Sequence, residues 1–160
     1  DFLADERGLA FEPWEGAVHL GKIAIGDEGR FALVKPSTYV NETGRVVQAL
    51  CDRYGLAADR FLVVCDDMHL DLGRVRVRGS GSSGGHNGLK SVERALGMQG
   101  YARLRIGIGG SRDAVDHVLG RFSDRDRKVI DVSLAEAADV VWKWIQGSGL
   151  VQLMDETNGE

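Results

Sequence analysis

Residues 61–65 form an uninterrupted apolar run, FLVVC, that ends directly at Asp66 and Asp67. This segment constrains the fold most, because a run without polar alternation predicts a strand buried on both faces of a parallel or mixed sheet. Further strands are predicted over about residues 17–25, 31–35, 74–78 and 104–108, and amphipathic helices over about 46–54, 89–96 and 124–146. Strands that alternate with helices predict an α/β fold, with a mixed, mostly parallel central sheet flanked by helices.

Composition predicts one folded domain over residues 1–160. The chain is 43% hydrophobic, has a formal net charge of −4, and contains no internal repeat or Pro-rich linker. No apolar run approaches the roughly 20 residues that span a bilayer, so no membrane segment is expected. Cys51 and Cys65 lack CxxC spacing, which favours reduced thiols and a cytoplasmic location. The acidic balance argues against a dedicated basic nucleic-acid module but permits a local basic face.

Basic residues are concentrated in one part of the chain. Seven of the 20 lysines and arginines lie between positions 74 and 105, namely Arg74, Arg76, Arg78, Lys90, Arg94, Arg103 and Arg105. Such a concentration predicts a surface that faces phosphates. The alternating arginines at 74–78 are equally consistent with a solvated edge strand that charge protects from aggregation.

Polar side chains mark the ends of several predicted elements: Asn41, Asp66, His86 and Asn87. Ligands of open α/β sheets bind at the carboxyl ends of strands, so these groups are candidates for one site. Three of them also have a structural explanation, as a helix cap for Asn41 and Asn87 and as an Asx-turn for Asp66.

Other site classes are disfavoured. The loop at 79–84 matches GxGxxG, but its preceding strand is not a buried apolar run and no acidic residue follows at the spacing that a dinucleotide site requires. The carboxylates beside Cys65 would raise its pKa, which favours a packed thiol over a nucleophile. Four scattered histidines show no metal-ligand spacing, so no metal site is expected.

Four segments in order resemble the bacterial-type peptidyl-tRNA hydrolase family. They are KPSTYVNETG at 35–44, LVVCDDMHL at 62–70, GGHNGLK at 84–90 and RLRIGIG at 103–109, with a weaker match, HVLG, at 117–120. The GGHNGLK and RLRIGIG strings are the most specific. The resemblance implies hydrolysis of the ester between peptide and tRNA, no cofactor, and a complete enzyme that is a monomer.

The resemblance implies a role for each matching residue. Asp66 matches the carboxylate that orients a catalytic histidine, and Asn41 and Asn87 match amides that position the attacking water and the ester carbonyl. Tyr39 matches a residue that lines the pocket for the tRNA 3′ end, together with Asn41 and Asn87. The cationic positions that match those gripping acceptor-stem phosphates are Arg76, Arg78 and Arg105.

The sequence departs from the family at its start. In the family, the general-base histidine lies on a leading strand and loop of the form GLGNPG…TRHN, which these residues do not contain. His19, His69, His86 and His117 do not match its position. We therefore expect an N-terminally truncated hydrolase domain that lacks its first strand and turns over little as given. The alternative is a catalytically inactive, RNA-binding relative; a nucleotide-binding domain is a third possibility, without an acidic partner for the ribose.

Overall fold

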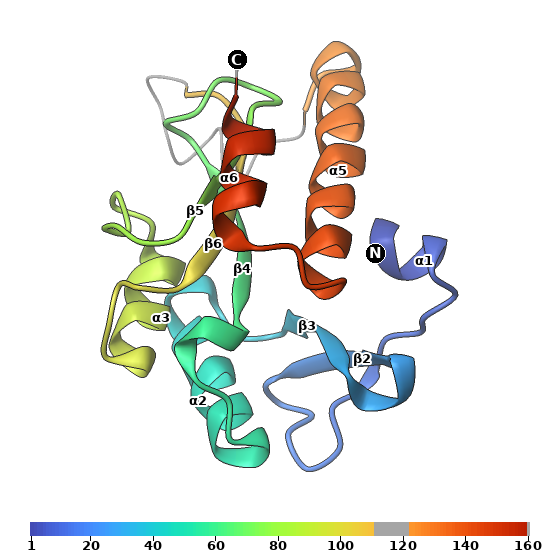
Figure 1. The fold of residues 1–160 in the computed structure, drawn as a ribbon, viewed down its shortest axis with the longest axis vertical. Helices are drawn as coiled ribbons and strands as arrows, with labels where there is room; N and C mark the ends of the chain where they lie inside the picture. Colours follow the sequence, from blue (N-terminus) through green and yellow to red (C-terminus); the bar gives the residue numbers. More distant parts are fainter. Residues whose placement is uncertain (111–121, 160) are drawn as a thin grey trace. The chain divides into compact units, whose positions relative to one another are not determined.

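The computed structural model describes residues 1–110 and 122–159. The chain forms two compact units. Unit 1 comprises Asp1–Arg60 and Gly81–Tyr101, and unit 2 comprises Phe61–Ser80 and Ala102–Glu160 (Figure 1). The single domain expected over residues 1–160 stays a prediction. The weak HVLG match, with His117, lies outside the described residues.

Unit 1 begins with α1 (Phe2–Glu6) and an antiparallel sheet in the order β1-β2-β3. The strands are β1 (Glu12–Pro13), β2 (Gly21–Gly26) and β3 (Phe31–Pro36), and η1 (Asp27–Gly29) links the last two. The strand predicted over 17–25 is shorter than expected, because residues 17–20 form turns in which backbone N–H groups of Ala17 and Leu20 bond three residues back. Gly21 is required by close packing: a Cβ there would lie 2.4 Å from the carbonyl oxygen of Lys35.

Two helices complete unit 1, together with η2 (Val40–Glu42) and η3 (Ala58–Arg60). They are α2 (Thr43–Tyr54) and α3 (Asn87–Leu96). The predicted helix ends are confirmed, since Gly55 and Gly97 follow the last helical residues with φ values of +65° and +69°. This left-handed conformation favours glycine and stops the helix.

Unit 2 contains a mixed sheet in the order β4-β6-β5. The strands are β4 (Leu62–Asp67), β5 (Val75–Arg78) and β6 (Ala102–Gly107); β4 pairs parallel with β6, and β5 pairs antiparallel with it. Helices α5 (Asp124–Ile145) and α6 (Leu150–Asn158) supply the apolar side chains that pack on one face of this sheet. The core residues are Val75, Val77, Leu104, Ala137, Val140 and Leu153. An α/β fold with a mixed sheet and flanking helices is thus confirmed, but the sheet is not mostly parallel, because among the described strands only β4 and β6 pair in parallel.

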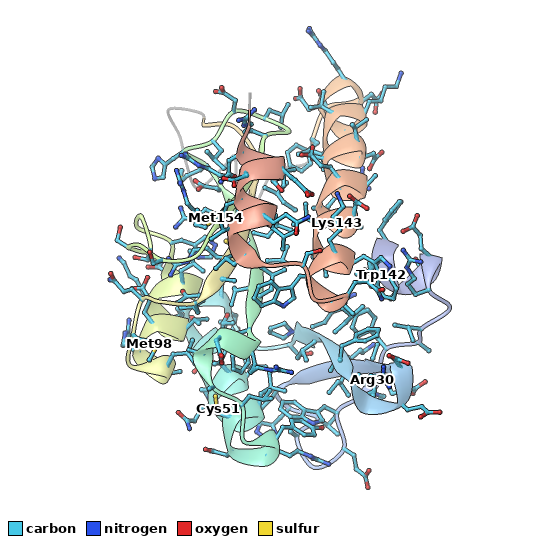
Figure 2. The ribbon with its side chains drawn as sticks, viewed as in Figure 1. Arg30, Cys51, Met98, Trp142, Lys143 and Met154 are labelled. Carbon is cyan, nitrogen blue, oxygen red and sulfur yellow. The ribbon has the colours of Figure 1, made fainter. Side chains whose placement is uncertain are left out.

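Polar contacts link α5 with α6. The ammonium group of Lys143 lies 3.1 Å from a carboxylate oxygen of Asp139 and 3.2 Å from one of Glu156 (Figure 2). The side chain of Asn158 at the end of α6 bonds the backbone of Val77 in both directions, at 2.9 Å each. It therefore occupies part of the free edge of β5 in place of another strand.

The prediction that β4 is buried on both faces is wrong. Val64 is 48% exposed, and Leu62, Val63 and Cys65 are only partly buried. Among the described residues β4 pairs with β6 alone, which places it at an edge of the sheet. An apolar run alone does not distinguish such a strand from a central one.

Among the described helices, none is both long and apolar enough to cross a membrane.

Candidate active site

Asn41 and Asn87 are brought to neighbouring positions in unit 1. Asn41 lies in η2, whose residue Val40 packs on the first turn of α3. A Cβ atom at Gly88 would lie 2.9 Å from Cγ2 of Val40, so a larger residue there would require neighbouring side chains to shift. Both asparagines are exposed. The packing of η2 on α3 therefore presents two neutral amides at one part of the surface of unit 1.

Helices α2 and α3, next to these asparagines, are in direct contact. The backbone N–H of Gly44 in the first turn of α2 donates to Oγ of Ser91 on α3 over 2.9 Å. A Cβ at position 44 would lie 2.2 Å from the carbonyl oxygen of Ser91. Because η2 leads directly into α2, the Gly44–Ser91 contact also fixes where Asn41 lies relative to α3.

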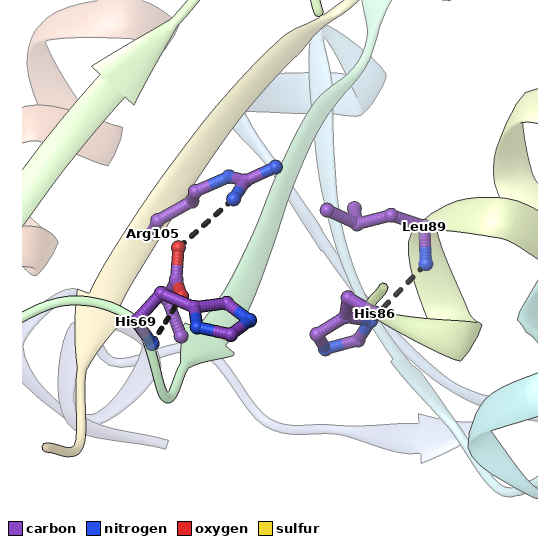
Figure 3. Close-up of polar contacts among 5 residues, drawn as sticks. His69, His86, Leu89 and Arg105 are labelled. Carbon is purple, nitrogen blue, oxygen red and sulfur yellow. Dashed lines mark hydrogen bonds and ion pairs between the residues drawn. The ribbon is translucent and has the colours of Figure 1, made fainter. Parts of the chain in front are cut away.

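His86 has a structural role in unit 1. It is the N-cap residue of α3, and its Nδ1 accepts a hydrogen bond from the backbone N–H of Leu89 at 3.2 Å (Figure 3). Accepting this bond requires an unprotonated Nδ1. The ring thereby satisfies one of the backbone donors at the start of the helix.

The cap explanations for the two asparagines are wrong. The N-cap residue of α3 is His86, and Asn87 is the first helical residue; the N-cap residue of α2 is Glu42. Tyr39, the N-cap of η2, is 82% exposed and makes no side-chain capping bond. Neither asparagine is therefore held in place as the cap of its helix.

In unit 2 the adjacent carboxylates Asp66 and Asp67 differ in their exposure to solvent. Asp66 is exposed, whereas Asp67 is 6% exposed and is held on both oxygens. Its Oδ1 accepts from the backbone N–H of His69 at 2.8 Å, and its Oδ2 lies 2.9 Å from Nη1 of Arg105 (Figure 3). The Asx-type bond that was considered for Asp66 is thus made by Asp67.

Strand register sorts the charged side chains of this sheet onto its two faces. Arg76 lies opposite Arg105 and Arg78 opposite Arg103, so the four share one face, here called the arginine face. Asp67 belongs to the same face, because Cys65 is in register with Arg105. Asp66 is in register with Ile106, so it belongs to the other face, which packs against the helices.

The arginines are not equally accessible. Arg76 and Arg78 are partly exposed, while the side chain of Arg105 is 16% exposed and ion-paired with Asp67. Arg103 is completely buried, so its inclusion in a basic surface was wrong. Alternation along a strand shows which residues share a face but not how deeply each one is covered.

The thiol of Cys65 is poorly suited to nucleophilic chemistry. Burial, reinforced by the neighbouring Asp66 and Asp67 and opposed by Arg105, raises the pKa of Cys65 to about 12. Carboxylates do contribute as expected, but burial is the larger cause. No group of three or more His, Cys, Asp or Glu side chains that could hold a metal ion occurs among the described residues.

Comparison with known proteins identifies the family. The family model described as peptidyl-tRNA hydrolase matches residues 1–160. The chain belongs to the peptidyl-tRNA hydrolase family. It is 38% identical to the peptidyl-tRNA hydrolase of Bifidobacterium adolescentis, over 99% of this chain and 84% of that relative. It is 47% identical to that of a Synechococcus species, over 99% of this chain and 71% of that relative.

Solved structures of the family have the same fold. A crystal structure of the peptidyl-tRNA hydrolase from Acinetobacter baumannii is 29% identical to this chain and matches it with a TM-score of 0.88. The match covers 99% of this chain and 81% of that one. The resemblance inferred from four short segments is therefore confirmed for both the family and the fold.

Unit 1 and unit 2 each carry part of the residues that the family resemblance singles out. Unit 1 contains Tyr39, Asn41 and Asn87, and unit 2 contains Asp66, Arg76, Arg78 and Arg105. Two features were missed at the sequence level: the capping role of His86, and the position of Asp67 beside Arg105. The HN pair before an apolar helical stretch could have suggested the first, but no sequence signal predicts the second.

Proposed function

We propose that this protein hydrolyses the ester between a peptide and tRNA, and thereby returns tRNA to translation in the cytoplasm. The observation that carries this proposal is the family match over all 160 residues. The proposed substrate contacts are the 3′ end and acceptor stem of peptidyl-tRNA, and the complete enzyme is proposed to act as a monomer.

The candidate residues have the chemistry that this reaction needs. A water oxygen attacks the ester carbonyl carbon, the bond to the tRNA 3′ oxygen breaks, and a peptide carboxylate and a 3′ hydroxyl result. Exposed amides such as Asn41 and Asn87 can orient the water and the carbonyl without titrating. In this proposal, Asp66 orients a general-base histidine, and Tyr39 lines the pocket for the 3′ end.

Phosphate binding is assigned to Arg76, Arg78 and Arg105. A guanidinium group can contact phosphate oxygens through parallel hydrogen bonds. Like charges directly opposite each other destabilise a strand pair, and Arg76 faces Arg105 across β5 and β6. A polyanionic ligand would offset this repulsion, which is what tRNA supplies.

The 160 residues alone are proposed to have little turnover. His86 is engaged as a helix cap, and neither His19 nor His69 matches the position of the family's general base. Peptide release from peptidyl-tRNA by this 160-residue chain should therefore be slow. Release at the rate of a peptidyl-tRNA hydrolase relative, measured alongside it, would contradict this proposal.

The role of the amides is tested in the natural protein that contains these residues. Asn41→Ala and Asn87→Ala should each lower kcat by about two to three orders of magnitude with the fold retained, as loss of an oriented polar group does in other hydrolases. Gln48→Ala is a matched control, because Gln48 is an exposed amide on α2 whose side chain bonds Asp52 on the same helix. Unchanged kcat in both asparagine variants would refute the assignment.

The arginines are tested by binding. Arg78→Ala should weaken the binding of tRNA and make the dependence of log K on log salt shallower by about 1, because one phosphate contact is lost. Arg125→Ala removes an exposed arginine at the start of α5 and should leave both quantities unchanged. Salt-independent binding by the parent chain would contradict the assignment of tRNA to the arginine face.

A further inference from the structure

The ion pair between Asp67 and Arg105 suggests a role for a residue that family resemblance does not single out. Both partners lie toward the carboxyl ends of the parallel strands β4 and β6 in unit 2. The side chain of Asp67 is 6% exposed and that of Arg105 16% exposed, so the pair is shielded from water. Screening by salt is weak for such a pair, and its geometry is correspondingly well defined.

Like charges lie close to Arg105 on the arginine face. Arg76 lies directly opposite it on β5, and Arg103 lies two residues away on the same face. Repulsion from these like charges favours conformations in which the guanidinium group turns away. The bond from Nη1 of Arg105 to Oδ2 of Asp67, at 2.9 Å, opposes that repulsion and restrains the guanidinium group.

Asp67 is itself fixed by the turn that follows β4. Its other oxygen accepts the backbone N–H of His69 at 2.8 Å, and its own carbonyl accepts from the backbone N–H of Ile108 at 3.1 Å. With both carboxylate oxygens engaged and little exposure, Asp67 is poorly placed to act as a base. The neighbouring Asp66 is exposed and belongs to the opposite face of the sheet.

We propose that Asp67 is a positioning residue, which holds the guanidinium group of Arg105 in the orientation that binds a tRNA phosphate. This role rests on the proposed function. It predicts that loss of the Asp67 carboxylate weakens phosphate binding, although the variant carries more positive charge. If Asp67 merely neutralised Arg105, the same change would strengthen binding.

The test measures binding of the 160-residue chain to tRNA that carries a peptide through an amide instead of an ester. Asp67→Asn should raise Kd about tenfold, a difference of about 1.4 kcal/mol, and make the salt slope shallower by about 1. Asp71→Asn is the matched control, because it removes an exposed acid from the same turn and should not raise Kd. An unchanged or lower Kd for Asp67→Asn, or a steeper salt slope, would overturn the proposal.

A second comparison separates positioning from general destabilisation. Arg105→Ala and the double variant Arg105→Ala/Asp67→Asn should have the same Kd within about twofold, because Asp67 acts through Arg105. Independent, additive effects would overturn the proposal. If Asp67→Asn does not fold, Asp67→Glu takes its place in the binding test. This variant keeps the charge but lengthens the side chain by one methylene, so Kd should shift. An unchanged Kd for Asp67→Glu would also overturn the proposal.

The two proposals fail in different ways. If the parent chain does not bind the amide-linked peptidyl-tRNA, the proposed function is refuted, and the role of Asp67 with it. If the parent binds with a clear salt slope while Asp67→Asn binds equally well, only the role of Asp67 is refuted.

Discussion

Gly44→Ala should disrupt the part of unit 1 that presents Asn41 and Asn87. The added methyl group would lie 2.2 Å from the carbonyl oxygen of Ser91 and 2.8 Å from its Oγ. The nearest atom belongs to the backbone, so no side-chain rotation relieves the contact. Helices α2 and α3 must separate by about 1 Å to restore an ordinary van der Waals distance.

The expected loss of stability combines three effects. Overpacking by one methyl group costs about 3 kcal/mol when backbone must move. Separation also weakens the hydrogen bond from Gly44 N–H to Ser91 Oγ, which contributes about 1 kcal/mol. Alanine regains about 1 kcal/mol of helix propensity. The net destabilisation is about 3 kcal/mol, which lowers Tm by about 10 °C in a chain of this size.

Thermal and urea unfolding, followed by circular dichroism, measure this effect. Gly100→Ala is the matched control, because a Cβ there meets nothing within 4 Å, and its Tm should be unchanged. Ser91→Ala added to Gly44→Ala should not restore stability, since the clash with the carbonyl oxygen remains. A Tm within about 2 °C of the parent for Gly44→Ala would refute the packing argument.

Three further predictions concern particular side chains. His86→Ala should destabilise the fold by about 1 kcal/mol in urea unfolding whereas His86→Asn, a good cap, should not; equal losses would contradict the capping role. Because the pKa of Cys65 is raised from 9.0 to about 12, the folded state keeps a proton that the unfolded state releases. The stability that the protonated Cys65 thiol contributes is complete below pH 9, and it should fall by about 1.4 kcal/mol for each pH unit above 9. Cys65→Val should flatten this dependence of stability on pH. An identical slope in the variant would contradict burial of the thiol. Asn158→Ala should lower the free energy of unfolding by about 1 to 3 kcal/mol by leaving the backbone of Val77 unpaired, and no loss would mean that water replaces both bonds.

The regular helices and central strands could be predicted from the sequence because each carries a local signal. Glycines with positive φ end α2 and α3, and the apolar stripe that predicted a helix over about 124–146 corresponds to α5, Asp124–Ile145. Helix α6 could not be predicted in the same way. Its nine residues are held by packing of Leu153 and by the bonds of Asn158 to β5, both of which are tertiary contacts.

The sequence suggested residues for the candidate site but not their geometry. Family resemblance supplied the residue types, and sequence spacing placed Asn41 and Asn87 at element ends. Which of two adjacent carboxylates is buried depends on strand register, which the letters DD do not reveal. Likewise, the alternation of Arg103 and Arg105 placed both on one face, yet one is fully buried and the other is ion-paired.

Release of peptide from peptidyl-tRNA tests the central claim most directly. The assay compares the natural protein that contains these residues with its Asn41→Ala/Asn87→Ala variant, both checked for folding by circular dichroism. The account predicts hydrolysis by the natural protein and a loss of at least about two orders of magnitude in the variant. No hydrolysis by the folded natural protein, or full hydrolysis by the variant, would contradict it.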